Sequence, residues 1–307
     1  MTQQIWKDYY VDLSAYLTDG ACDYELRKGA DTLYTGRAYA APDGTCKVRV
    51  NDVCADWLGT ALPDVSALAF TADDSLVAFA LYVGGSKVED IVLYRDWSYD
   101  RGWDPYTGGV SSAPIRLEAD IRMPILQSRL TAGSVTVDVR GTATTVSVTG
   151  SGVIAVPAQG ATGTVTIGDV TWKLVETCRR WALYYVNAYG GWDQLTLEGG
   201  QVTETYGRST IDTDYDNNYE TARGTRVYRE GVGTGWSLRT GLLTDEQAAL
   251  MRHVTGTVEA FLYDMEQDEW YPVTVQEAGW QEKAYRWGKR RVEYTLDVAL
   301  AQERIRR

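Results

Sequence analysis

The order of apolar and polar residues predicts β-strands over most of the chain. The clearest case is 181–197, WALYYVNAYGGWDQLTL, where Leu183 and Tyr185 alternate before two glycines and Leu195 and Leu197 repeat the alternation after them. A period of two is that of a half-buried strand, and paired glycines supply the positive φ angles of a tight hairpin. This segment therefore predicts a β-hairpin, and the chain after it is expected to complete the sheet that the hairpin begins.

Shorter alternating runs divide the N-terminal part into strands and turns. In CKVRV, Cys46, Val48 and Val50 are expected to point inward and the two basic residues outward. Gly84-Gly85 indicates a hairpin between two apolar runs. Pro42-Asp43-Gly44 indicates a turn, because proline presets φ and glycine accepts a left-handed conformation.

The stretch from Gly141 to Gly168 has no charged residue and is mainly Thr, Val, Gly, Ser and Ala. β-branched residues at alternate positions favour short strands over a disordered low-complexity segment. We therefore divide the chain into an N-terminal β-sandwich domain (1–125), a small Thr/Val/Gly-rich β module (126–172) and a C-terminal β domain (173–307).

The C-terminal part is predicted to hold the single amphipathic helix, at about 243–254. Thr244 is a good N-cap and Gln247 follows three residues later, as in a capping box. The run from Val292 to Leu300 alternates strictly, so it predicts a strand with one buried face. The fold class is therefore mainly β, a multi-domain β-sandwich with one helix.

Two further segments complete this part. Residues 206–224 are polar and rich in tyrosine, which predicts a mobile arm. Residues 227–241 predict one more pair of strands.

The net charge of the chain limits the kinds of partner that it is expected to bind. A net charge of −12 is unsuited to gripping nucleic acid, which needs a basic surface to displace counterions from phosphate. A basic run before the last strand and a second at the end of the chain are interpreted as a solvated turn and a charged tail. They consist of Lys283, Arg286, Lys289, Arg290 and Arg291, and of Arg304, Arg306 and Arg307.

The sequence contains few residues that could form a catalytic or metal-binding site. His253 is the single histidine, which argues against Ser-His-Asp, Cys-His and multi-histidine metal sites. Asp212, Asp214 and Asp216 match the opening of a calcium loop, but Arg223 stands where the closing glutamate belongs, so they are interpreted as an acidic solvated loop. No catalytic, cofactor-binding or metal-binding residue is assigned, no cofactor is expected, and the chain is predicted not to be an enzyme.

The cysteines and the chain start indicate a compartment. Cys22, Cys46, Cys54 and Cys178 lack Cys-x-x-Cys spacing and are interpreted as small buried hydrophobes in a reducing compartment, with a Cys46–Cys54 or Cys22–Cys46 bridge left open. The start shows no signal segment, and no run approaches a membrane span in length. We therefore expect synthesis in a cytoplasm and no membrane insertion.

The segments LYYVNAYGGWDQLTLEG, LLTDEQAALMRHV and WYPVTVQEAGWQEKAYRWGKRRVEYTLDVALA together resemble tail proteins of bacteriophages, as does the N-terminal run LYTGRAYAAPDGTCKVRVNDVCADWL. The resemblance is greatest to distal tail or baseplate-hub-associated proteins of phages and prophages of gut Bacteroidetes-like hosts. It covers about two thirds of the chain, leaves out 130–170, and contains no catalytic signature.

The resemblance implies a tail-tube-like β-sandwich with a helix and a structural role in the virion tail. Such proteins assemble as rings, usually hexameric, which join the tail tube to the tip around the DNA channel and contact other tail or baseplate proteins. The alternative is a carbohydrate- or receptor-binding β protein, or a sugar-cleaving enzyme, suggested by Trp103, Trp192 and the tyrosines of 206–224.

Overall fold

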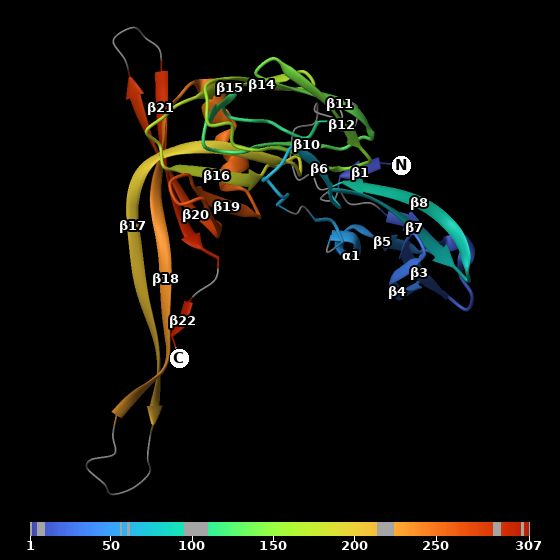
Figure 1. Ribbon diagram of the computed structural model, residues 1–307. Helices are drawn as coiled ribbons and strands as arrows, with labels where there is room; N and C mark the ends of the chain where they lie inside the picture. Colours follow the sequence, from blue (N-terminus) through green and yellow to red (C-terminus); the bar gives the residue numbers. More distant parts are fainter. Residues whose placement is uncertain are drawn as a thin grey trace, which may run out of the picture.

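The computed structural model describes residues 2–4, 10–55, 57–59, 62–94, 110–213, 224–284, 290–301 and 304–306. Its strands form several sheets and its helices are short, so the prediction of a mainly β, multi-sheet fold is confirmed (Figure 1). Among the described residues, no helix is both long enough and apolar enough to cross a membrane.

The N-terminal sheet has a core of its own. Its strand order is β1 (Thr2–Gln4), β8 (Ser86–Tyr94), β7 (Leu76–Val83), β3 (Ala21–Lys28) and β4 (Asp31–Tyr39). The expected hairpin at Gly84-Gly85 joins β7 to β8, and both glycines have positive φ. A small sheet of β2 (Tyr10–Asp12) and β5 (Lys47–Arg49) covers it, together with α1 (Asn51–Ala55). The short helix η1 (Ser14–Tyr16) follows β2 and has no buried residue.

The expected alternation in CKVRV is confirmed, because Cys46, Val48 and Val50 are buried while Lys47 and Arg49 are exposed. The four cysteines are free thiols, so neither of the two bridges left open is formed. Cys178 is exposed, which corrects its assignment as a buried hydrophobe.

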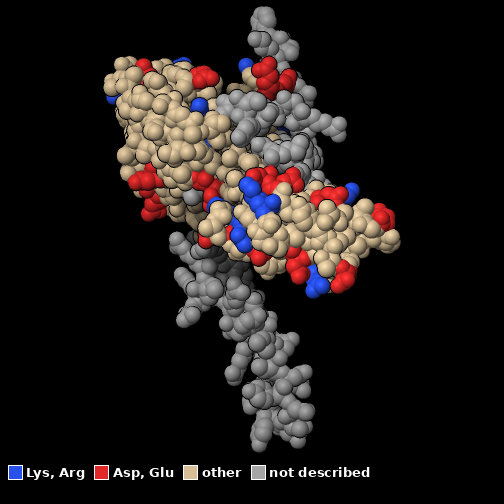
Figure 2. Space-filling model, turned by 90° about the vertical axis from the view of Figure 1, so that its right-hand side faces the viewer, with Lys and Arg blue, Asp and Glu red and all other residues tan. Residues whose placement is uncertain are grey.

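The uncharged segment forms strands, as predicted. One sheet has the order β12 (Thr142–Val148), β11 (Gly133–Val139), β14 (Gly163–Ile167), β15 (Val170–Val175) and β9 (Glu118–Asp120). It packs on a second sheet of β10 (Ile125–Arg129), β13 (Gly152–Val156) and β6 (Ala69–Ala72). In Figure 2, charged side chains are sparse over this upper part of the face and gather over the N-terminal part below it.

The division of the chain into 1–125, 126–172 and 173–307 stays a prediction. Two pairings cross its first boundary, because β6 pairs with β13 and β9 pairs with β15. Strands from before residue 126 therefore complete both sheets of the uncharged segment.

The C-terminal sheet closes on itself. Its order is β17 (Trp192–Thr213), β16 (Trp181–Val186), β19 (Ala260–Asp264), β20 (Glu269–Ala284), β21 (Arg290–Leu300), β18 (Gly224–Leu243) and β22 (Arg304–Arg306), and β17 also pairs with β18. That extra pairing makes β16 to β21 a closed barrel.

The predicted pair of strands at 227–241 is wrong, because these residues lie in the single strand β18. The arginines of the charged tail, Arg304 and Arg306, lie in β22 and not in an unstructured end.

The predicted hairpin at 181–197 is confirmed and lies at the centre of the molecule. Val186 pairs with Trp192 across the turn, and Gly190 has φ +81°. β16 is buried on both faces. Leu183 and Tyr185 pack into the barrel interior, and Tyr184 packs against the core of the neighbouring sheets. The hairpin thus joins the two cores.

The helix expected at about 243–254 is present as two pieces, α3 (Asp245–Ala249) and α4 (Met251–Thr255), with a break at Leu250. The capping box is confirmed, since Thr244 Oγ1 accepts from the Gln247 backbone N–H and the Gln247 side chain accepts from the Thr244 N–H. The expectation of a single helix is corrected further by α1, which the sequence reading did not anticipate.

Candidate functional site

A long two-stranded extension is the most distinctive surface of the barrel. β17 and β18 pair from Glu198 opposite Arg239 out to Thr213 opposite Gly224. β18 pairs with β21 only from Gly235 onward, so residues 204–213 and 224–234, here called the arm, extend beyond the barrel (Figure 1). The mobile arm expected at 206–224 stays a prediction, and of its residues 206–213 lie in β17 and 224 begins β18. Residues 214–223 lie outside the described part of the chain.

The arm has little support besides its own pairing. Three residues of β22 pair with Glu230 to Val232, and they are the third strand that the arm has among the described residues. By register, Gly231 lies opposite Gly207, and Gly233 and Gly235 lie opposite Thr205 and Thr203. Glycine therefore stands at every other position of β18 from 231 to 235. Glycine at alternate positions of a strand suits a close approach by another backbone.

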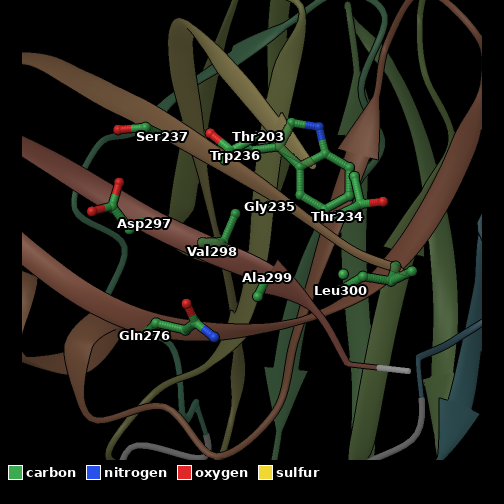
Figure 3. Close-up of a pocket in the computed structure, with 11 residues that line it drawn as sticks. Thr203, Thr234, Gly235, Trp236, Ser237, Gln276, Asp297, Val298, Ala299 and Leu300 are labelled. Carbon is green, nitrogen blue, oxygen red and sulfur yellow. The ribbon is translucent and has the colours of Figure 1, made fainter. Parts of the chain in front are cut away.

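A shallow groove lies where the arm meets the barrel (Figure 3). Its volume is about 430 Å³. Asp297 is the one ionisable side chain of its lining, and the remaining side chains are small, amide or apolar. The lining is Thr203, Gly233, Thr234, Gly235, Trp236, Ser237, Gln276, Asp297, Val298, Ala299 and Leu300. A groove with this lining presents backbone groups and a surface shape to a binding partner. It contains no nucleophile paired with a base.

Aromatic rings fill the end of the barrel from which the arm leaves. The ring centroids of Trp181 and Trp236 are 5.9 Å apart, and Tyr271 lies 5.6 Å from Trp236. The Arg180 guanidinium lies 4.8 Å from the Trp181 ring and donates to both carboxylate oxygens of Asp264, with Nε 3.0 Å from Oδ1. Because these groups are packed and paired, the arm begins from a rigid base.

A buried polar cluster holds the central hairpin against the irregular segment that precedes β9. The Asp193 carboxylate is fully buried, and its Oδ2 accepts from the Asn187 side chain at 2.7 Å and from the Ala113 N–H at 2.9 Å. Asn187 also donates to the Ser111 carbonyl at 2.8 Å. Burial raises the pKa of Asp193 to about 7, although these hydrogen bonds oppose the rise.

A glycine makes this contact possible. A Cβ on Gly191 would lie 2.2 Å from the Ser111 carbonyl oxygen, so the hairpin turn needs a residue without a side chain here. Asn187 and Asp193 flank the turn in the sequence, and that pair of polar residues between apolar strands was the available signal for the cluster.

The residues singled out from the sequence are not brought together into one site. Trp192 is fully buried in the core shared by the sheets of the uncharged segment, so it is not part of the exposed aromatic surface that the carbohydrate-binding alternative requires. Trp103 lies outside the described residues, as do Asp214 and Asp216, while Asp212 lies in β17. Within the described ranges, no group of three or more His, Cys, Asp or Glu could hold a metal ion.

His253 supports the fold, and the described residues of the basic run lie in strands. His253 is buried on α4, and its Nδ1 accepts from the Ala188 N–H at 3.2 Å, so it supports the hairpin turn. Lys283 lies on β20, and Arg290 and Arg291 open β21. Arg286 and Lys289 lie outside the described residues.

No protein-family model matches this chain, and no curated protein matches it. Among solved structures, it is similar to a chain in the tail of an empty GTA particle with C6 symmetry and to one in the sixfold-symmetrised baseplate of the anti-feeding prophage. Each likeness has 11% identity and a TM-score of 0.26 over 43% of this chain, and spans 98% and 95% of the respective neighbour. At that TM-score, neither likeness establishes the fold or the function of this chain.

Proposed function

We propose that this chain is a non-enzymatic structural protein of a bacteriophage-type tail or baseplate. It assembles as a homo-oligomeric ring, hexameric in the form we favour, around a channel through which DNA passes. It is made in the host cytoplasm and resides in the virion tail, where it contacts other tail or baseplate proteins. The sequence resemblance to distal tail and baseplate-hub proteins suggests the class, and the arm is the observation that carries the proposal.

The arm needs a partner surface. Apart from the three residues of β22, the described arm is a two-stranded ribbon. A two-stranded ribbon alone is marginally stable in water, because it has nothing against which to bury a face. The ten residues 204–213 span about 33 Å at the rise of a β-strand. Over that length β17 has no neighbour on its outer edge among the described residues, so its N–H and C=O groups on that edge are available to a strand of another chain. A second copy provides such a surface in a ring.

The negative net charge of the chain suits the lining of a channel through which DNA passes. A chain with a net charge of −12 repels DNA from the surfaces that it exposes, which allows DNA to pass without binding. The same charge opposes self-association, so contacts between copies have to use surfaces where charges are absent or opposite in sign.

The test is the solution mass of the full chain by light scattering over a range of concentrations, with negative-stain images of the same samples. We expect a closed ring at several times the monomer mass. A chain that stays monomeric at every concentration and shows no rings in the images would overturn the proposal of self-assembly.

A truncated arm provides the control. Arg208 and Glu230 are opposite each other, so replacing 209–229 by Asn-Gly closes the hairpin with a two-residue turn and leaves the barrel intact. This variant should fold, with an unchanged tryptophan fluorescence spectrum because 209–229 contains no tryptophan, and remain monomeric. A truncated chain that still forms rings would show that the arm is not the interface.

A further inference from the structure

A second groove lies at the end of the barrel away from the arm and is strongly basic. Its volume is about 550 Å³, and it is lined by Arg116, Leu117, Glu118, Lys173, Arg179, Leu242, Thr244, Gln247 and Arg291. Four of these side chains are basic and one is acidic, in a chain whose net charge is −12. No local sequence pattern indicates this groove, because its basic residues come from four separate segments and only Arg291 belongs to the basic run.

The groove holds positive charge that the described carboxylates only partly neutralise. Arg179 donates to Thr196 Oγ1 at 2.7 Å and to Glu198 at 3.2 Å, whereas Arg116 donates to the Leu242 carbonyl at 2.9 Å. Burial and then the nearby Arg179 lower the pKa of Arg116. Like charges held this close are stabilised by an anionic group placed between them.

Of the two remaining basic residues, Lys173 is exposed and Arg291 is half-buried. Among the described residues, no carboxylate lies within ion-pair distance of Lys173 or Arg291. Two leucines border the groove with much of their side chains exposed, Leu117 at 45% and Leu242 at 40%. The groove therefore fits a segment that combines carboxylates with apolar or aromatic side chains.

This chain contains such a segment. The sequence 211–220, IDTDYDNNYE, here called the tip, begins with the last residues of β17 and continues into the segment that connects β17 to β18. It has four carboxylates, no basic residue, two tyrosines and an isoleucine. The groove and the tip are thus opposite in charge and alike in carrying apolar groups between the charges.

A chain cannot place its own tip in its own groove. Leu242 lines the groove and Gly224 begins the same strand at the tip, so about 60 Å of β18 separates them at the rise of a β-strand. In Figure 1, β15 and the labelled part of β21 lie at the top, and the arm extends toward the bottom.

We propose that the basic groove binds the acidic tip of the arm of a second copy of this chain. The contact is head-to-tail, because the two surfaces differ, and head-to-tail contacts generate closed rings or filaments. The inference rests on the proposed self-assembly and identifies the surface that receives the arm.

The first test uses a fluorescein-labelled peptide of residues 209–221 and the full-length chain, diluted until light scattering shows monomers. We expect binding by fluorescence anisotropy that weakens with salt, and a loss of roughly tenfold or more in the variant Lys173→Glu/Arg291→Glu. The matched control is Lys47→Glu/Lys87→Glu, which makes the same charge change on exposed residues of the N-terminal unit and should bind like the wild type.

Two outcomes would overturn the proposal. One is equal binding of the peptide to the wild type and to the groove variant. The other is equal binding of a scrambled peptide of the same composition, which would make the groove a general site for acidic polymers.

A charge exchange then tests the contact in the assembly. The tip variant Asp214→Lys/Asp216→Lys should lose assembly, and combining it with Lys173→Glu/Arg291→Glu in one chain should restore it. Rings with no peptide binding would leave the ring proposal standing and overturn this one. Peptide binding with no oligomer would support the contact between tip and groove while the ring proposal fails.

Discussion

Replacing Asp193 by Asn is expected to change the pH dependence of stability. The pKa of Asp193 is about 7 in the folded chain, about three pH units above its ordinary value of 3.8, because the carboxyl is fully buried. The folded state therefore binds a proton that the unfolded state releases between pH 4 and 7. A group with a raised pKa contributes stability that is present below about pH 4 and is lost as the pH rises to about 7.

The magnitude follows from the difference in pKa. One pH unit corresponds to about 1.4 kcal/mol, so the ionised carboxylate costs the folded state up to about 4 kcal/mol above pH 7. Asn has the same shape, and its oxygen can accept from Ala113 and Asn187 as Asp193 Oδ2 does. The other titratable group facing Asp193 is Tyr185, whose pKa is raised by burial and then by that carboxylate, so it stays neutral over this range.

The assay is urea unfolding of the wild type and of Asp193→Asn at several pH values from 4 to 8.5. We expect equal free energies of unfolding near pH 4 and a variant that is more stable than the wild type by up to about 4 kcal/mol at pH 8. A difference between the two chains that does not change with pH would refute this reasoning, as would a variant that is less stable at pH 8.

Three other substitutions test the packing around the barrel. Gly191→Ala should cost about 3 kcal/mol of unfolding free energy, because its Cβ would lie 2.2 Å from a backbone oxygen, whereas Gly199→Ala, with open space around it, should be near neutral. Thr244→Ala should cost about 1 kcal/mol through loss of the helix cap. Arg180→Ala should cost about 2 kcal/mol, because it leaves the buried Asp264 unpaired, and Arg180→Lys should recover part of the loss. Thermal and urea unfolding measure all of these, and a neutral Gly191→Ala or Arg180→Ala would contradict the contacts described.

Local pattern was sufficient for the short-range elements of the fold. The hairpin at 181–197 and the capping box at Thr244 depend on residues close in sequence, so alternation, paired glycines and cap chemistry predicted both. The uncharged stretch was likewise predicted as strands from its β-branched residues.

The pairing of strands that are far apart in the sequence could not be predicted from local pattern. No local signal indicates that 69–72 pairs with 152–156, or that β17 pairs with β18 to close the barrel. The polar residues at 206–213 indicated a loop, because local pattern does not show that this strand is specified by its pairing with β18. Trp192 read as a surface aromatic because period-two alternation cannot distinguish a strand buried on one face from one buried on both.

The candidate surfaces were less accessible to sequence reading than the fold. The polar cluster needs Asp193 to meet Ala113 and Asn187 to meet Ser111, although these residues are far apart in the sequence. The basic groove collects side chains from 116, 173, 179 and 291. Sites assembled from distant segments appear only when the chain is folded.

The most direct test of the central claim is amide hydrogen exchange of the full chain at low and high concentration. If the arm is ordered by a neighbouring copy, amides of 204–213 and 224–234 should gain protection as concentration rises, while those of β19 in the barrel stay unchanged. Arm amides whose protection is the same at every concentration would contradict the account.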